Sequence, residues 1–508
     1  MSEIKIQRVW QMPNKNTFDI KPIKELILKY KDKLPEGAVI ADPFANKNKI
    51  ANITNDLDPQ YDTTHHMDAT DFLKSLDDNS LDMLLYDPPY CYDKNTMILT
   101  RSGWKNISDV NETDEIATRA PNGEIEYQHP TSIIQKNYAG KMIKIKNDKI
   151  DLLVTPNHNC LIKNGDEFGL IEAGMLNQVT DPIIFTSHIK WKSIPLLETE
   201  IPSVHSKSLN KTFDTKYWYT VELMRFLGIF FRYGETKIIA KKRKDTQKYT
   251  INYKTILTYK NISEREEKLI DRTVMRTIPV FHGDVKYRKT KTGYIFSGKQ
   301  LYVFLSQFKN KDNRVIPQFI KEYSAQDFRK MFEFLFRSER TFETKSKTFA
   351  YDLQEVIMKA GGNAIVLKKE DIYVVTPSTT HYNENIVNRE DVQEIDFEGQ
   401  IYCVSVPNMV IMVQREGIPC WCGNSPRQVS ECYKNLGQTV NMETTQASYW
   451  SKQKAEIGRL VKQGGYVVTC SWNSGGIGKK YGFEIVEILL VAHGGWHNDT
   501  IVVVERKV

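Results

Sequence analysis

Short apolar runs alternate with amphipathic stretches at both ends of the chain. Near the N-terminus, strands are predicted over 37–41, 50–54 and 81–86, with a helix over 71–76. Near the C-terminus, the pattern predicts a helix over 450–463 that Gly464 and Gly465 end, a buried strand over 466–472, and a hairpin of strands 483–493 and 500–505. Alternating strands and helices are typical of a doubly wound α/β sheet.

Acidic residues accompany the predicted N-terminal strands. Asp42, Asp56 and Asp87 each follow a strand, and Asp68 precedes the helix. A single acid in such a place is more often a helix cap or a turn residue. Four in succession favour a site, because the carboxyl ends of parallel strands meet at the edge of the sheet where ligands bind.

The tetrapeptide Asp87-Pro88-Pro89-Tyr90 is the most distinctive motif of this region. Its two prolines fix the backbone and remove two N–H donors, so a carboxylate and a phenol are held rigidly at a strand end. A tight surface turn would explain the motif structurally. The motif also resembles motif IV of S-adenosylmethionine (SAM)-dependent amino-methyltransferases that act on adenine or cytosine in nucleic acid. The resemblance implies that Asp87 and Pro88 accept hydrogen bonds from the exocyclic amine, and that Tyr90 stacks on a flipped base.

The same resemblance extends to the SAM site and to the far end of the chain. The segment Asp42–Asn46, which includes Phe44, is similar to the Phe-x-Gly-x-Gly loop of this family, although Ala45 and Asn46 stand where glycines are expected. The resemblance implies that Asp56 binds the ribose and Asp68 lies near the adenine of SAM. The C-terminal helix, strand and hairpin are what a seven-stranded methyltransferase still lacks. We therefore predict a Rossmann-like α/β methyltransferase, favouring adenine N6, that an insert splits in two.

Four sequence blocks in order resemble those of an intein, with an all-β HINT-type splicing domain. Cys91 opens the first block, Val154–His158 resembles the Thr-x-x-His block, and Ile401–Asn408 resembles the block before the second junction. Cys422-Gly423-Asn424 then leads into Ser425. A lone Cys or Asn-Ser is usually a packed thiol or a turn. Four ordered blocks whose ends fall inside a catalytic motif indicate an insert that removes itself.

The resemblance implies a role for each junction residue. Cys91 attacks the preceding carbonyl and forms a thioester, because sulfur is the best side-chain nucleophile near neutral pH. Thr155 donates to the developing oxyanion, and His158 moves protons beside the same bond. Ser425 then attacks the thioester, Asn424 cyclises, and an acyl shift joins the flanks without any cofactor.

Two departures from the intein pattern concern the last steps. Gly423 stands where a histidine commonly precedes the terminal Asn, and Met409 replaces a second common histidine. Cys403 occupies a position that is often Asp or Cys and offers a substitute group. We predict splicing that is slow at Asn cyclisation and that releases 334 residues from a 174-residue product.

Within the insert, two helical segments resemble the dodecapeptide helices of LAGLIDADG homing endonucleases. They are 222–234 and 328–340. In that family each helix ends in an acid that binds the catalytic metal, whereas here the first position is Tyr233 and the second is Glu339. Phe334 and Arg340 also replace small residues that allow the helices to pack closely. We predict a degenerate α+β nuclease, with Mg²⁺ as a cofactor only if cleavage survives.

Charge and composition restrict the remaining classes. The 508 residues carry a net charge of +7; the flanks hold 21 basic and 22 acidic residues, and the insert 49 and 41. The excess therefore lies in the insert, where basic runs such as 241–244 and 286–291 suit contact with DNA phosphate, although a solvated face explains any one of them. The seven cysteines form no paired framework. Neither a signal peptide nor an apolar run of about 18 residues is present, so we expect a soluble cytoplasmic protein with DNA as partner, no membrane and no obligate protein partner.

We therefore predict five segments and keep two alternatives open. The alternatives are an unspliced methyltransferase that uses the insert to recognise DNA, and a remnant intein that cleaves at one junction. The predicted segments are the methyltransferase halves 1–90 and 425–508, the splicing-domain halves 91–200 and 386–424, and the nuclease-like domain 201–385.

Overall fold

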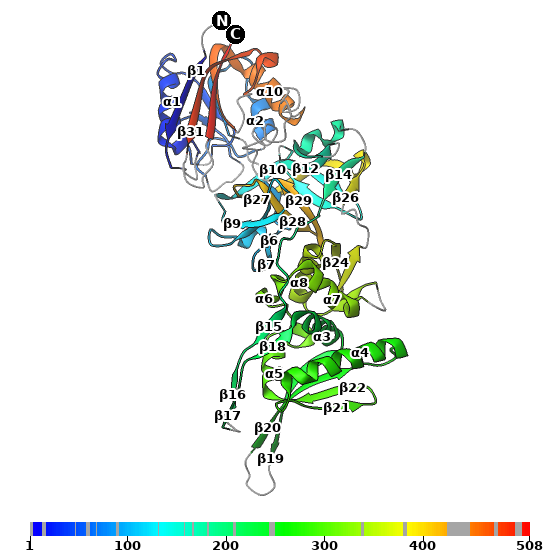
Figure 1. Ribbon diagram of the computed structural model, residues 1–508. Coiled ribbons are helices and arrows are strands. Elements are labelled where there is room, and N and C mark those ends of the chain that lie inside the picture. The colour runs from blue at the N-terminus through cyan, green and yellow to red at the C-terminus, as the bar shows by residue number, and fades with distance from the viewer. Residues whose placement is uncertain are drawn as a thin grey trace. The chain divides into compact units, whose positions relative to one another are not determined.

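The computed structural model divides the chain into two compact units, which are described separately below (Figure 1). The first unit is Met1–Asn122, Glu126–Ser187 and Glu384–Val508, and the second is Gly123–Ile125 and His188–Asn383. No helix in the described part of the chain is long and apolar enough to cross a membrane. The structure describes residues 4–12, 17–45, 47–56, 61–67, 69–87, 91–130, 132–156, 158–164, 167–179, 182–206, 210–242, 249–336, 340–378, 384–423, 448–471, 476–492 and 500–508.

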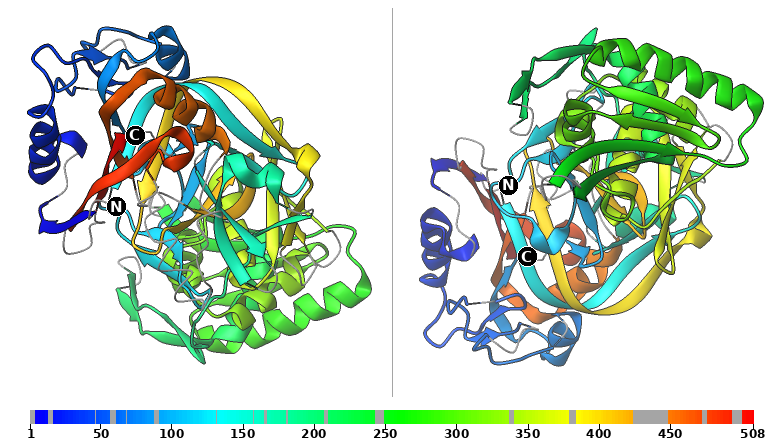
Figure 2. Two further views of the ribbon diagram at one scale, coloured as in Figure 1. Left: turned by 90° about the horizontal axis from the view of Figure 1, so that it is seen from above. Right: turned by 90° about the horizontal axis from the view of Figure 1, so that it is seen from below.

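Both ends of the chain contribute strands to one seven-stranded sheet in the first unit. The strand order is β1 (Lys5–Trp10), β31 (Phe483–Ala492), β32 (Thr500–Lys507), β30 (Val461–Ser471), β4 (Leu81–Tyr86), β2 (Ile40–Asp42) and β3 (Ile53–Thr54). The pairs β30–β4, β4–β2 and β2–β3 are parallel, whereas β32 is antiparallel to both of its neighbours. Figure 2 shows the blue N-terminal and red C-terminal strands side by side.

Helices cover both faces of this sheet. β4 is buried along its whole length, and alternate side chains enter opposite cores. Met83 and Leu85 pack with α1 (Lys21–Lys31), while Leu84 packs with α2 (Ala69–Ser75) and α10 (Ser448–Leu460). A central strand of a parallel sheet has to be apolar on both faces, which explains the continuous run that the sequence presents.

The two glycines predicted to end the C-terminal helix lie inside a strand instead. α10 ends at Leu460 and β30 begins at once at Val461. Gly464 has a φ of +83°, and the register of β30 against β4 shifts between Val461 and Tyr466. A Cβ at Gly465 would lie 2.9 Å from the Asp82 carbonyl oxygen. The glycines therefore form an irregularity where the two backbones approach closely.

The rest of the first unit is almost entirely β structure. The long strands β10 (Ser132–Lys146) and β27 (Val392–Ser405) pair antiparallel and form a closed barrel with β11 (Asp151–Val154) and β5 (Tyr92–Asp93). A second sheet contains β29 (Ile418–Gly423), β28 (Val410–Arg415), β6 (Met97–Thr100), β7 (Gly103–Asn106), β8 (Ile116–Arg119) and β9 (Ile125–Gln128). A third contains β13 (Glu167–Glu172), β12 (Asn159–Asn164), β14 (Ile183–Thr186) and β26 (Glu384–Val387).

The second unit has two helices at its centre, α3 (Thr220–Tyr233) and α7 (Ala325–Leu335). Its other helices are α4 (Glu264–Thr277), α5 (Lys299–Ser306), α6 (Gln318–Lys321) and α8 (Lys347–Lys359). One sheet of this unit contains β19 (Gly234–Lys242), β20 (Tyr249–Thr258), β22 (Gly293–Ser297) and β21 (Lys286–Thr290). A second contains β23 (Phe342–Thr344), β25 (Ile372–Ser378) and β24 (Asn363–Lys369). Two further pairs are β15 (Glu198–Ile201) with β18 (Lys216–Tyr219), and β16 (Val204–Ser206) with β17 (Lys211–Phe213).

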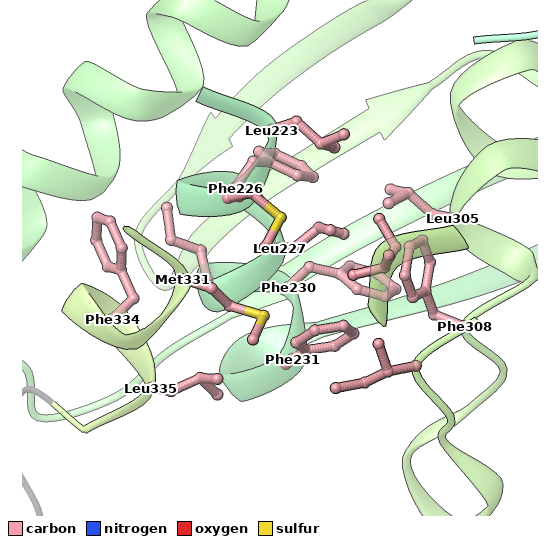
Figure 3. Close-up of a cluster of buried hydrophobic side chains, with 14 of the residues drawn as sticks. Leu223, Phe226, Leu227, Phe230, Phe231, Leu305, Phe308, Met331, Phe334 and Leu335 are labelled. Atoms are coloured by element: carbon pink, nitrogen blue, oxygen red, sulfur yellow. The ribbon is translucent and has the colours of Figure 1, made fainter. Parts of the chain in front are cut away.

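Two expectations about the central helices were wrong. The second helix, expected over 328–340, ends at Leu335, so Arg340 is not part of it. Phe334 does not hold the helices apart, because a Cβ added at Gly228 of α3 would lie only 2.3 Å from the Met331 carbonyl oxygen of α7. Figure 3 shows α3 and α7 contributing Phe226, Phe230, Met331 and Phe334 to one buried cluster. A single glycine is enough for close approach, and phenylalanines fill the remaining space.

This close approach makes Gly228→Ala destabilising. Alanine normally favours a helix over glycine by about 1 kcal/mol. Here its methyl group meets backbone that cannot rotate away, and such overpacking costs about 1–3 kcal/mol. We expect a net loss of stability in the second unit, measured by hydrogen-exchange mass spectrometry of α3 and α7 peptides in increasing urea. The exposed Arg272→Ala on α4 is the control. A Gly228→Ala protein as stable as the parent would contradict the close packing.

Candidate functional sites

The first predicted junction begins at Cys91, directly before the barrel strand β5. Cys91 is fully buried, and its backbone N–H donates to Thr155 Oγ1 at 3.0 Å. The Thr155 N–H donates in turn to the Cys91 carbonyl oxygen at 2.9 Å. This reciprocal pairing continues the antiparallel contact of Val154 with Tyr92. The sequence predicted Thr155 as a donor to an oxyanion; in the structure its hydroxyl oxygen accepts from the nitrogen of the Tyr90–Cys91 bond.

His158 lies in the turn that follows Thr155. Its N–H donates to the Thr155 carbonyl at 2.9 Å, and its fully buried imidazole packs on the Tyr92 ring with centroids 4.1 Å apart. His158 Nε2 is 3.6 Å from Cys422 Sγ. Among the described residues, His158 Nδ1 has no hydrogen-bond partner. One ring nitrogen of His158 thus contacts β29 (Ile418–Gly423).

The second predicted junction follows β29, whose last residue is Gly423. The Tyr92 hydroxyl donates a hydrogen bond to the Gly423 carbonyl oxygen, although 331 positions separate the two residues. The segments next to both junctions therefore meet at one buried cluster. Of the other predicted splicing and methyltransferase residues, Pro88, Pro89, Tyr90, Asn424 and Ser425 lie outside the described residues.

Cys403 belongs to the same core as Cys91. Both thiols are buried in a cluster with Met142, Leu153 and Ile401, where β27 runs beside β5. The structure therefore brings together the four predicted splicing residues that it describes, which are Cys91, Thr155, His158 and Cys403.

The cluster contains three further groups to which the sequence assigned no role: Tyr92, Cys160 and Cys422. Burial raises the pKa of Cys422, but a hydrogen bond from Cys160 and the charge of His158 outweigh burial and lower that pKa below its usual value. The shared hydrogen bond and burial raise the pKa of Cys160. In the described part of the chain, no group of three His, Cys, Asp or Glu side chains is arranged to hold a metal.

The predicted acids converge at the carboxyl edge of the seven-stranded sheet. Asp42 ends β2 and is fully buried; it accepts hydrogen bonds from Phe44 N and Asn48 Nδ2, both at 3.0 Å. Burial raises the pKa of Asp42 to about 7 against the effect of these bonds, and the nearby charges of Asp87 and Asp56 raise it further. Asp68 lies outside the described residues.

The loops around these acids are held by a buried asparagine and by aromatic packing. Asn55 Nδ2 donates to the carbonyl oxygens of Pro43 and Met67, and Asn55 Oδ1 accepts from Met67 N at 3.1 Å. The Phe44 ring meets the Tyr86 ring edge-on at 5.8 Å. The loop after β2 is therefore fixed against the end of β4 and the segment before α2, although no sequence pattern marked Asn55.

In the second unit, the tyrosine at the predicted acid position is engaged elsewhere. The Tyr233 hydroxyl donates to Glu266 Oε1 at 2.8 Å, and burial together with this bond raises the pKa of Tyr233 to about 12. Its expected counterpart Glu339 lies outside the described residues. Of the predicted basic run 241–244, Lys241 and Lys242 are exposed at the end of β19, and residues 243 and 244 lie outside the described residues. Most of the run 286–291 forms the exposed strand β21 of the same sheet.

Comparison with curated proteins finds relatives of unlike function. No family model matches the chain. It is 25% identical over 308 residues to an ATP-dependent Clp protease proteolytic subunit of Chlamydomonas moewusii, covering 55% of this chain and 28% of that protein. It is also 25% identical over 406 residues to the C-terminal section of a DNA-directed RNA polymerase subunit beta of Stigeoclonium helveticum, covering 66% and 36%. The chain spans about a third of the length of these relatives.

Solved structures similar to parts of the chain include homing endonucleases and an intein. A mesophilic variant of the homing endonuclease I-DmoI has 14% identity and a TM-score of 0.24, covering 32% of this chain and 89% of that one. I-DmoI in complex with DNA and Mn also has 14% identity and a TM-score of 0.24, covering 31% of this chain and 90% of that one. A class 3 split intein, AceL NrdHF, has 15% identity and a TM-score of 0.17, over 41% and 97%.

The raised pKa of Asp42 predicts that the seven-stranded sheet becomes less stable as pH rises towards 7. A folded-state pKa of about 7, above the unfolded value, means that the stabilising effect of the neutral carboxyl is complete at acidic pH and is lost as pH rises towards 7. Asp42→Asn mimics the neutral form. We expect the parent sheet to lose stability relative to Asp42→Asn between about pH 4 and pH 7, measured by urea-dependent hydrogen exchange of β2 and β4 peptides.

Asp82 provides a control of opposite sign. Burial raises its pKa, but bonds from Lys462 and Val39 N outweigh burial and leave the pKa below its usual value. Asp82→Asn should therefore lose its destabilising effect as pH falls below about 4. A stability difference between parent and Asp42→Asn that does not change with pH would contradict the assignment for Asp42.

Proposed function

We propose that the chain is a self-splicing precursor, in which an intein of residues 91–424 interrupts a SAM-dependent amino-methyltransferase that acts on nucleic acid. One observation carries the proposal. The chain leaves the seven-stranded sheet after β4 and returns to it in β30, the direct neighbour of β4. Between them, residues 91–423 begin and end at one buried cluster that contains Tyr92 and His158.

The chemistry at the first junction needs only groups of the chain. Cys91 Sγ attacks the Tyr90 carbonyl carbon, so that a C–S bond replaces the peptide C–N bond and the thiol proton ends on the Cys91 nitrogen. Thr155 supports this step because its hydroxyl lies 3.0 Å from that nitrogen. His158 is attached to the same turn and is the group that moves the proton.

The second junction completes the exchange. Ser425 Oγ attacks the thioester carbon, an ester forms, and the proton returns to the Cys91 thiol. Asn424 Nδ2 then attacks its own backbone carbonyl carbon, which breaks the bond to Ser425 and gives the Ser425 nitrogen a proton. A final oxygen-to-nitrogen shift makes the Tyr90–Ser425 peptide. Holding the ends on one cluster makes each step effectively unimolecular.

The relatives support an element that is independent of its host. A protease subunit and an RNA polymerase subunit carry out different reactions, yet both are similar to this chain at the same level of identity. The shared sequence covers about a third of each relative. An inserted element that occurs in proteins of different activity accounts for this pattern more simply than a common enzyme does.

The flanks supply the methyltransferase of the proposal. The acids at the sheet edge suit a cationic cofactor, with Asp42, Phe44, Asp56 and Asp68 holding SAM, which when bound supplies the methyl group. Asp87 and Pro88 would accept hydrogen bonds from the target amine, Pro89 would keep the motif rigid, and Tyr90 would stack on the base. After splicing, this motif continues directly into Ser425.

The second unit would bind DNA without cleaving it efficiently. Its sheet presents the basic strands β19 and β21, and these suit phosphate contacts. Tyr233 is a poor ligand for Mg²⁺, and its hydroxyl is bonded to Glu266. Glu339 alone would be left as a vestigial ligand, so the domain is proposed to be a degenerate homing endonuclease.

Expression followed by mass spectrometry tests splicing. We expect a 174-residue ligated product that contains a Tyr90–Ser425 peptide, and a free 334-residue insert. Cys91→Ala combined with Asn424→Ala should abolish every product, because both bond-breaking groups are removed. Asn106→Ala, at an exposed asparagine of the insert, is the matched control and should splice normally.

The alternatives give different products. Recovery of the intact chain alone would favour an unspliced methyltransferase that keeps the insert for DNA recognition. Cleavage at one junction without ligation would favour a remnant intein. Either result would overturn the proposed splicing reaction.

Transfer of a labelled methyl group tests the activity of the flanks. Spliced protein with labelled SAM should methylate adenine in DNA or RNA, and Asp87→Ala should lower the rate at least about a hundredfold if this carboxylate positions the amine. Asp71→Ala, an exposed acid on α2, is the control. Equal transfer by the parent and Asp87→Ala, or no transfer by either, would refute the methyltransferase assignment.

A further inference from the structure

The residue before the terminal asparagine has no room for a side chain. A Cβ built on Gly423 would lie 2.5 Å from the Asn159 carbonyl oxygen, 2.8 Å from Asn159 Cβ and 3.1 Å from Leu170 Cδ2. Two of these contacts are closer than real Cβ atoms show, and one involves backbone. Any group that assists the second junction therefore has to come from another part of the fold.

Tyr92 reaches the junction from the opposite end of the insert. It is fully buried, and its hydroxyl donates to the Gly423 carbonyl oxygen. Burial, and then the neighbouring Cys422, raise the pKa of Tyr92, so the phenol keeps its proton near neutral pH and remains a donor. The preceding residue of β29 is held as well, because Cys422 Sγ lies 3.6 Å from both His158 Nε2 and the Asn159 carbonyl oxygen.

These contacts fix the last peptide group before Asn424. The Gly423 carbonyl belongs to the Gly423–Asn424 peptide plane, so a hydrogen bond to its oxygen restricts rotation of that plane. Asn424 cyclisation requires the side-chain amide nitrogen to reach its own backbone carbonyl carbon, and restricted rotation favours such a near-attack geometry. Glycine by itself would leave this segment with the widest choice of backbone conformations.

We propose that Tyr92 is a positioning residue for the second junction, whose hydroxyl orients the Gly423–Asn424 peptide and so takes the place of a side chain at position 423. The proposal rests on the proposed splicing function. In the step that it assists, the Asn424 Nδ2–C bond forms as the C–N bond to Ser425 breaks, and one Nδ2 proton goes to the Ser425 nitrogen. Tyr92 keeps its own proton throughout.

The test separates the two junctions in the full-length chain. In a Cys91→Ala background, adding Tyr92→Phe should slow release of residues 425–508 about five- to tenfold, which is the effect expected from losing one hydrogen bond in the step measured. In an Asn424→Ala background, the same change should leave cleavage of the first junction by hydroxylamine within twofold. The second assay also reports that the barrel is folded.

Tyr402→Phe is the matched control. Tyr402 is the strand partner of Tyr92, and its hydroxyl donates to Gln400 Oε1 at 2.7 Å and not to a junction. Equal rates of release for Tyr92→Phe and Tyr402→Phe would overturn the positioning role while leaving splicing intact. Equal losses at both junctions in Tyr92→Phe would also overturn it, because the residue would then be structural. If the parent forms neither thioester nor spliced product, the proposed function itself fails.

Discussion

The parallel pairing of β4 with β30 is the constraint on which the rest of the first unit depends. Parallel neighbours need a long crossover, and here residues 91–423 lie within that crossover. The two ends of this segment lie close together, as the Tyr92–Gly423 hydrogen bond shows. The second unit is connected in the same way. The chain enters it after β14 and returns to the first unit in β26, where Thr186 pairs with Glu384. Because the ends of each long segment are adjacent, the sheet that the segment leaves can form as though the segment were a loop.

A buried ion cluster then holds the barrel around the junctions. Arg415 of β28 contacts Asp93 at 3.2 Å and Asp151 at 2.5 Å, and both carboxylates are buried. Asp93 is the neighbour of Tyr92, and Asp151 begins the strand that leads to Thr155. Removing one partner would leave buried charge uncompensated, which typically costs about 3–5 kcal/mol. Arg415 thereby ties β28, the strand partner of β29, to both strands next to the first predicted junction.

The sequence predicted features that depend on local patterns of residues. It did not predict contacts between backbone segments that are far apart in the chain. Apolar periodicity predicted β4 with the same bounds, and ordered blocks predicted that Cys91, Thr155 and His158 would lie together. Tyr92 was passed over because its partner, Gly423, lies 331 positions away and nothing local marks the contact. The close approach of Gly228 to Met331 was misjudged for the same reason. Gly464 and Gly465 carried a correct signal of irregular backbone, but strand pairing with β4 placed it within β30.

Under the proposed function, the position of the insert makes methyl transfer depend on splicing. The break falls after Tyr90, whose carbonyl is the acyl donor and whose ring is the proposed stacking surface. Before splicing, the Tyr90 carbonyl has to be accessible to the Cys91 thiol. After splicing, Tyr90 has to be rigid to hold a flipped base. The reciprocal hydrogen bonds between Cys91 and Thr155 hold the backbone of the proposed nucleophile in place. The flanks are nearly neutral, with 21 basic and 22 acidic residues, so long-range attraction to nucleic acid belongs to the insert. Excision therefore yields an enzyme that must recognise its substrate through contacts at the sheet edge, since it no longer has the basic strands of the second unit.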